Sequence, residues 1–70
     1  MQMVPINSDV FTAVGYDTYR KLLQVTLKNG VTYEHTGVPE STYNELIAAK
    51  SKGKYYASNI KRIYAHRRID

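Results

Sequence analysis

Cysteine and tryptophan are absent from this chain of 70 residues, which also has only two prolines and four glycines. Without cysteine, neither a disulfide nor a thiolate-bound zinc ion can add to a small hydrophobic core that contributes about 3–5 kcal/mol. No apolar run approaches the ~20 residues that span a bilayer, and no basic segment precedes an apolar one as in a secretory signal. We therefore expect one small cytoplasmic domain over residues 1–70, ordered over about residues 4–69, with no membrane partner.

Acidic residues are scarce in the last third of the chain. Residues 50–70 contain seven Lys and Arg residues and one acidic residue, whereas residues 1–49 contain three basic and five acidic residues. A basic segment of this kind raises the local potential and attracts polyanions. A solvated helix face followed by a soluble tail has the same composition, and this alternative stays open.

Three segments alternate apolar and polar residues as strands do: residues 10–16, 23–27 and 31–35. A two-residue loop at Asn29-Gly30 would place the apolar residues of the second and third segments on opposite faces. A three-residue loop over residues 28–30 keeps them on one face. We therefore predict that loop, with Gly30 as a left-handed bulge.

The predicted loops also define a register. The three-residue loop pairs Leu23 with His35 and Val25 with Tyr33. The same requirement, that apolar residues share one face, favours a four-residue loop over residues 17–20, which pairs Val14 with Leu23. Three strands then share one apolar face.

Two segments of the second half carry apolar residues at helical spacing. The first begins near Pro39, which is tolerated in a first helical turn, and Gly53 is expected to separate it from the second. The two stripes are Tyr43, Leu46, Ile47 and Lys50, then Tyr56, Ile60, Ile63 and Tyr64. The predicted fold is α+β, with a three-stranded antiparallel sheet in the order β-β-β-α-α and two C-terminal helices packed on one face. The predicted core consists of Val10, Val14, Leu23, Val25, Leu27, Val31, Tyr33, Tyr43, Leu46, Ile47, Tyr56, Ile60 and Ile63.

A series of short motifs runs along the chain in a characteristic order. They are Asn7-Ser8-Asp9-Val10 leading into Val14-Gly15-Tyr16-Asp17, Asn29-Gly30, Tyr33-Glu34-His35, Gly37-Val38-Pro39, Ser51-Lys52-Gly53-Lys54-Tyr55-Tyr56 and Ile60-Lys61-Arg62-Ile63-Tyr64. Together they resemble the KTSC domain family, over roughly residues 4–69. That family is named for its place at the C-terminus of some lysyl-tRNA synthetases, and it includes small stand-alone bacterial and phage proteins.

The resemblance implies no established activity, and RNA binding is the suggested role. This sequence departs from the family pattern at two positions. The central Tyr-x-Tyr of the family appears here as Tyr33-Glu34-His35. The Asn that usually follows the aromatic pair of the second helix appears as Ala57, although Ser58 and Asn59 follow directly.

The sequence favours a binding module over an enzyme. His35 and His66 are the only imidazoles, and neither has carboxylates at the spacing of a zinc site or of a catalytic base and its orienting partner. The glycines are dispersed singly, so no phosphate-cradling loop is expected. We predict no catalysis, no cofactor and no metal, and we interpret His35, opposite Leu23, as a partly buried structural residue.

One flank of the second predicted helix has the chemistry of an RNA-binding surface. Tyr55, Asn59, Arg62 and His66 recur at helical spacing, which would form a strip beside the buried stripe. An aromatic ring stacks on bases and a guanidinium pairs with phosphates. A solvated amphipathic flank is the alternative. The predicted site for RNA or another polyanion consists of Tyr55, Asn59, Lys61, Arg62, His66, Arg67 and Arg68.

The opposite sheet face suggests a different kind of partner. Phe11 and Leu22 are expected to be exposed there among threonines. Exposed apolar residues of this kind mark contacts with proteins. The alternative function is therefore protein interaction through Phe11 and Leu22, either as a homodimer or with a host or other partner protein.

Overall fold

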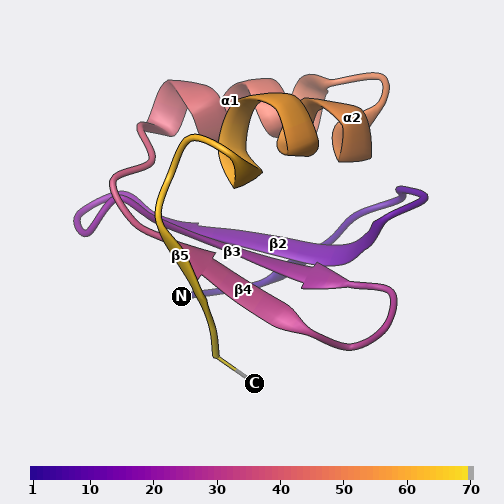
Figure 1. Cartoon of the computed structure of the whole chain (residues 1–70), viewed down its shortest axis with the longest axis horizontal. Helices are drawn as coiled ribbons and strands as arrows, with labels where there is room; N and C mark the ends of the chain where they lie inside the picture. Colours follow the sequence, from indigo (N-terminus) through magenta and orange to yellow (C-terminus); the bar gives the residue numbers. More distant parts are fainter. Residues whose placement is uncertain (70) are drawn as a thin grey trace.

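The computed structural model describes residues 1–69, which form one antiparallel sheet with helices on one of its faces (Figure 1). In the described residues the sheet has five strands in the order β1-β2-β3-β4-β5. The strands are β1 (Val4–Pro5), β2 (Phe11–Asp17), β3 (Leu22–Leu27), β4 (Thr32–His35) and β5 (His66–Arg68). The helices are α1 (Glu40–Ala48), α2 (Lys52–Tyr56) and a π-helical turn, η1 (Ala57–Lys61).

The α+β class and the placement of two helices on one face are confirmed, but the expected number of strands is wrong. The predicted strands correspond to β2, β3 and β4, and two short edge strands extend the sheet on either side. β1 has two residues and β5 has three, so neither is long enough to show an alternating pattern. No helix within residues 1–69 has the length and apolar content needed to cross a membrane.

The loop between β3 and β4 has the predicted form. Leu27 N donates to Val31 O at 2.9 Å, and Gly30 N donates to Leu27 O at 2.9 Å. Gly30 has φ +90°, a conformation that glycine adopts without steric cost. The predicted pairing of Leu23 with His35 is confirmed, and the apolar residues of both strands therefore share one face.

The loop between β2 and β3 is displaced from its predicted place. Asp17 pairs with Leu22 and Val14 pairs with Val25, so the pairing of Val14 with Leu23 is wrong by two residues. Lys21, the last residue of the observed loop, has a left-handed backbone conformation with φ 57°. Because a two-residue displacement preserves the alternation of a strand, Val14 still faces the core.

Phe11 lies inside the core, which contradicts the exposed position expected from the sequence. The register shifts between Phe11 and Ala13, because a bulge inserts Thr12 between them. The bulge reverses the face of the residues before it. Phe11 is 0% exposed and Val10 is 39% exposed, so each takes the place predicted for the other.

The helical layer buries fewer of its apolar residues than the stripes predicted. Ile47 is 40% exposed and Ile63 is 62% exposed, and neither belongs to the core. Val38, in the connection between β4 and α1, is fully buried and was missed because it lies outside any periodic segment. The buried core consists of Phe11, Val14, Leu23, Val25, Val38, Leu46, Tyr56 and Ile60.

The second helix begins earlier and ends earlier than expected. Gly53 lies inside α2 and does not break the chain between the helices. η1 ends at Lys61, and the chain then turns back to the sheet, where Thr36 N donates to Ala65 O at 3.1 Å. Ile63 therefore falls beyond the helix, which explains its exposure.

Candidate nucleic-acid interface

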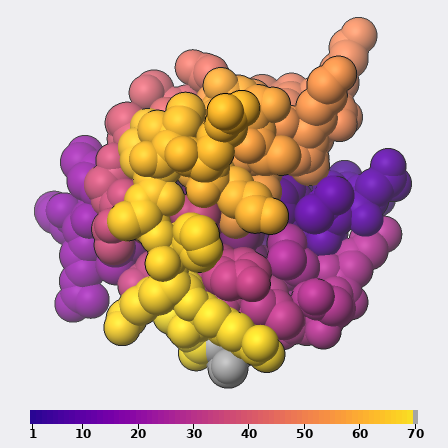
Figure 2. All heavy atoms as spheres, viewed as in Figure 1, coloured from indigo at the N-terminus to yellow at the C-terminus, as the bar shows by residue number. Residues whose placement is uncertain are grey.

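The basic residues of the last third occupy two separate places. The first, here named the lysine cluster, comprises Lys50, Lys52 and Lys54, at the connection between α1 and α2 and the start of α2. The second, here named the C-terminal cations, comprises Lys61, Arg62, Arg67 and Arg68, between the end of η1 and β5. Lys52 and Lys61 stand at opposite ends of the continuous helix of α2 and η1, roughly 10 Å or more apart along its axis. In Figure 2 the end of the chain, in yellow, crosses the front of the molecule, while the orange segment that begins α2 projects at the upper right.

The helical strip of Tyr55, Asn59, Arg62 and His66 is not formed. Arg62 is the C-terminal cap of η1, and His66 is the first residue of β5. The strip required one α-helix through residue 66. The helix ends early because β5 must reach the edge of β4, where His35 pairs with His66.

Tyr55 joins the two helices and does not form the open stacking surface that the sequence predicted. Its hydroxyl donates to Glu45 Oε1 at 2.9 Å, and its half-buried ring packs against the core. Partial burial raises the pKa of Tyr55, and the hydrogen bond to Glu45 acts in the same direction. Asn59, one turn further, donates through Nδ2 to the Tyr55 carbonyl oxygen at 3.2 Å.

His66 packs on the sheet instead of on a helix flank. Its ring lies edge-on to Tyr33, with the ring centroids 5.4 Å apart, and 5.3 Å from the ring of His35. His35 lies opposite Leu23 on the core face, as predicted, but it is fully buried rather than partly buried, and it shares a 2.7 Å hydrogen bond with the Tyr56 hydroxyl. Burial lowers the pKa of His35, the neighbouring His66 lowers it further, and the Tyr64 backbone acts in the opposite direction.

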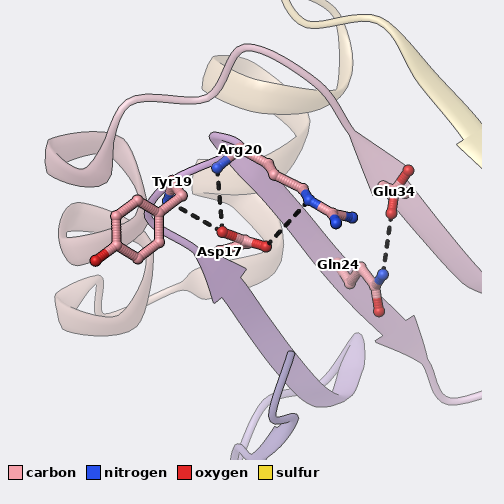
Figure 3. Close-up of polar contacts among 5 residues, drawn as sticks. All are labelled: Asp17, Tyr19, Arg20, Gln24 and Glu34. Carbon is pink, nitrogen blue, oxygen red and sulfur yellow. Dashed lines mark hydrogen bonds and ion pairs between the residues drawn. The ribbon is translucent and has the colours of Figure 1, made fainter.

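Arg67 takes part in a polar group on the sheet face away from the helices. Its Nε donates to Glu34 Oε1 at 3.3 Å. Gln24 Nε2 donates to the other oxygen of this carboxylate, Glu34 Oε2, at 3.0 Å, the bond that Figure 3 shows. Glu34 is only 8% exposed, so these two donors compensate a carboxylate that is largely removed from water. The side chain of Arg67 remains 75% exposed, so an anion can still approach it.

The turn between β2 and β3 exposes an aromatic residue that the predicted site omitted. Asp17 Oδ1 accepts hydrogen bonds from the backbone N–H groups of Tyr19, at 3.0 Å, and Arg20, at 3.1 Å (Figure 3). This arrangement holds the turn, and Tyr19 is left 97% exposed. The sequence signal was the Asp at the start of a turn, which favours such side-chain to backbone bonds.

The C-terminal cations are exposed, as an anion-binding surface requires. The side chains of all four residues, Lys61, Arg62, Arg67 and Arg68, are exposed. Of the predicted aromatic residues, Tyr55 is half-buried, whereas His66 is exposed but has its ring against Tyr33 and His35.

A five-stranded antiparallel sheet with two helices on one face and exposed cations at its C-terminal edge defines a small α+β domain. The family model of the KTSC domain matches residues 7–64, and the chain belongs to this family. A KTSC domain protein from Yersinia pestis has a crystal structure similar to this one, with a TM-score of 0.92 and 31% identity over 99% of this chain and 97% of the other.

Two bacterial proteins are similar in sequence. A protein of Tsukamurella paurometabola is 32% identical over 59 residues, which cover 84% of this chain and 88% of that protein. An uncharacterized protein of Stutzerimonas stutzeri is 30% identical over 71 aligned positions, which cover 100% of both chains.

The two departures from the family pattern fall in different environments. His35, in place of the second aromatic, is part of the buried contact between the sheet and α2. Ala57, in place of the usual Asn, is exposed at the start of η1. A change at the first position therefore affects packing, whereas the second lies on the surface.

Proposed function

We propose that this KTSC domain is a non-catalytic cytoplasmic module that binds RNA or another polyanion through its C-terminal cations. The observation that carries the proposal is the exposure of Lys61, Arg62, Arg67 and Arg68 on a segment whose only acidic residue is Asp70. Such a segment attracts a phosphate backbone whatever its sequence. No cofactor is required for this role.

The contacts that support this proposal are electrostatic. Tyr55 is half-buried and hydrogen-bonded to Glu45, and the exposed His66 lies on the sheet, so the stacking strip that the sequence predicted does not contribute. Binding through charge alone gives a dissociation constant of roughly 10⁻⁴ to 10⁻⁶ M and falls steeply with salt. If about three phosphates of a single strand are engaged, the slope of log K against log salt is near −2.

Fluorescence anisotropy with labelled tRNA and a single-stranded oligonucleotide, at several salt concentrations, tests the proposal. Replacement of Lys61 and Arg62 by Gln should make the salt slope shallower by about 1, whichever sequence is bound. The matched control replaces Lys21 and Lys28, two exposed lysines outside the last third, by Gln. Absence of binding at low salt, or an equal loss in both double variants, would contradict binding through the C-terminal cations.

The structure does not support the alternative function, protein interaction through a surface formed by Phe11 and Leu22. Phe11 is 0% exposed and lies edge-on to Tyr56, with ring centroids 5.1 Å apart. Leu22 is half-buried. A partner would have to unfold the core to reach Phe11, so we do not propose this surface.

A further inference from the structure

A cleft at the end of the helical layer lies apart from the C-terminal cations. Its walls are residues 7–10, which lead into β2, and residues 50–54, which connect α1 to α2. Both segments lie at the right edge of the molecule in Figure 1 and Figure 2, the first in indigo and the second in orange. The cleft has a volume of about 390 Å³, which is within the range of sites for small molecules.

The charge of this cleft is predominantly positive. All three residues of the lysine cluster line it, against a single carboxylate, that of Asp9. Lys50 and Lys54 are exposed, whereas Lys52 is half-buried and donates through Nζ to the Ala49 carbonyl oxygen at 2.9 Å. That bond uses one of the three N–H donors of an ammonium group and holds its position. The cleft therefore favours an anion.

Each wall also has a serine hydroxyl. Ser8 Oγ accepts a hydrogen bond from Val10 N at 3.1 Å, which leaves its O–H hydrogen to donate to a ligand. Ser51 occupies the N-cap position of α2 but makes no capping bond through its side chain within the described residues. Hydroxyl donors on both sides, together with ammonium groups, match a ligand with several acceptor oxygens.

The two walls of the cleft touch through Gly53 and Val10. A Cβ atom at Gly53 would overlap Val10 Cγ2, so only glycine allows α2 to approach the segment before β2 this closely. This contact explains why a poor helix former lies near the start of α2. Because Val10 and Gly53 both line the cleft, this contact holds its two walls together.

We propose that this cleft binds a phosphate monoester, carried either by a free nucleotide or by the 5′ end of an RNA. A phosphate monoester has a charge of about −1.5 to −2 at neutral pH and three acceptor oxygens. Three ammonium groups and two hydroxyl groups complement it, whereas an internal phosphodiester has less charge and no free end. The site is independent of binding through the C-terminal cations, because no residue is shared.

Titration of the ¹⁵N-labelled protein with adenosine 5′-monophosphate at low salt tests the site. We expect saturable shifts confined to the amides of residues 7–10 and 50–54, with a dissociation constant on the order of millimolar or tighter. The double variant K50A/K54A should weaken binding by about tenfold, because two charge-assisted contacts are lost. The matched double variant K61A/R62A removes the same charge outside the cleft and should change affinity by less than about twofold.

Two oligonucleotides of the same sequence, one with a 5′-phosphate and one with a 5′-hydroxyl, distinguish the sources of the monoester. Tighter binding of the phosphorylated one, lost in K50A/K54A, identifies an RNA end, while equal binding of both with retained nucleotide binding identifies a free nucleotide. No saturable shift with the nucleotide, or an equal loss in both double variants, overturns the site. The proposed function is tested separately: if the nucleotide does not bind but oligonucleotides do, and K61A/R62A weakens their binding, only the cleft proposal is wrong.

Discussion

The contact between α2–η1 and the sheet differs in kind from the end of the helical layer where the lysine cluster lies. In the contact, Tyr56 and Ile60 are buried, Tyr56 lies edge-on to Phe11, and the polar His35 is enclosed and hydrogen-bonded. At the other end the lining is polar, and most of its side chains are exposed. Burial of apolar surface contributes about 25 cal/mol per Å², whereas an exposed charge pair contributes about 0–1 kcal/mol. Stability therefore depends on the first region, and the second can be altered for binding at little cost to the fold.

The largest difference between the regions is expected from truncation of the core. Replacement of Leu46 or Ile60 by Ala should lower the free energy of unfolding by about 2–5 kcal/mol, because each side chain is fully buried. That loss approaches the whole stability of a domain of this size. Urea denaturation followed by circular dichroism measures it.

Ile63→Ala is the matched control for Ile60→Ala. Ile63 is 62% exposed, so its truncation should change stability by no more than about 0.5 kcal/mol. Similar losses at the two positions would show that the end of η1 is packed differently from the structure described above.

A smaller effect is expected from the hydroxyl of Tyr56. Tyr56→Phe keeps the ring but removes the partner of His35 Nε2, and a buried polar group left unpaired costs about 1–3 kcal/mol. Burial also raises the pKa of Tyr56 to about 12, as expected for a hydroxyl shielded from water. Urea midpoints of the variant and the parent give the difference.

Tyr55→Phe provides the comparison for that measurement. Its hydroxyl bonds to Glu45 in an exposed position, where water replaces the lost partner. We expect a loss below about 1 kcal/mol. If Tyr55→Phe lowered the free energy of unfolding more than Tyr56→Phe, the buried hydroxyl would not be the more important of the two for stability.

The last difference is a dependence of stability on pH. The pKa of His35 is lowered in the folded state, so between that value and the unfolded value of about 6.5 the unfolded chain binds more protons. Stability contributed by neutral His35 is therefore complete above pH 6.5 and falls as the pH decreases, by at most about 1.4 kcal/mol per pH unit. Denaturation of the parent and of His35→Gln between pH 7.5 and 5 should show this slope only in the parent.

Sequence periodicity was most informative where strands are long and joined by short loops. The register of β3 and β4 followed from Leu27, Gly30 and Val31, because a one-residue slip would have moved every apolar side chain to the wrong face. The core-facing position of His35 followed from the same register, although its burial is more complete than predicted. The bulge at Thr12 could not be predicted in this way, since only Phe11 of β2 precedes it and a single residue shows no alternation.

The candidate site was predictable only in its charge. Exposure of Lys61 and Arg62 followed from composition and position, but their arrangement with Tyr55 and His66 depended on how far a helix extends. The cleft near the lysine cluster joins residues 7–10 to residues 50–54, which are about 40 positions apart in the chain. No local pattern links segments that distant.

By itself, the sequence determined the class of fold, the three central strands, the apolar face that they share and the concentration of positive charge in the last third. These properties depend on residue type and on neighbours a few positions away, and are therefore visible as periodicity and composition. Only the tertiary structure decided that Phe11 is buried, that the chain leaves η1 to become β5 and that Gly53 brings α2 against Val10. Each of these depends on contacts between distant segments, where close packing and the pairing of a sheet edge outweigh local preference.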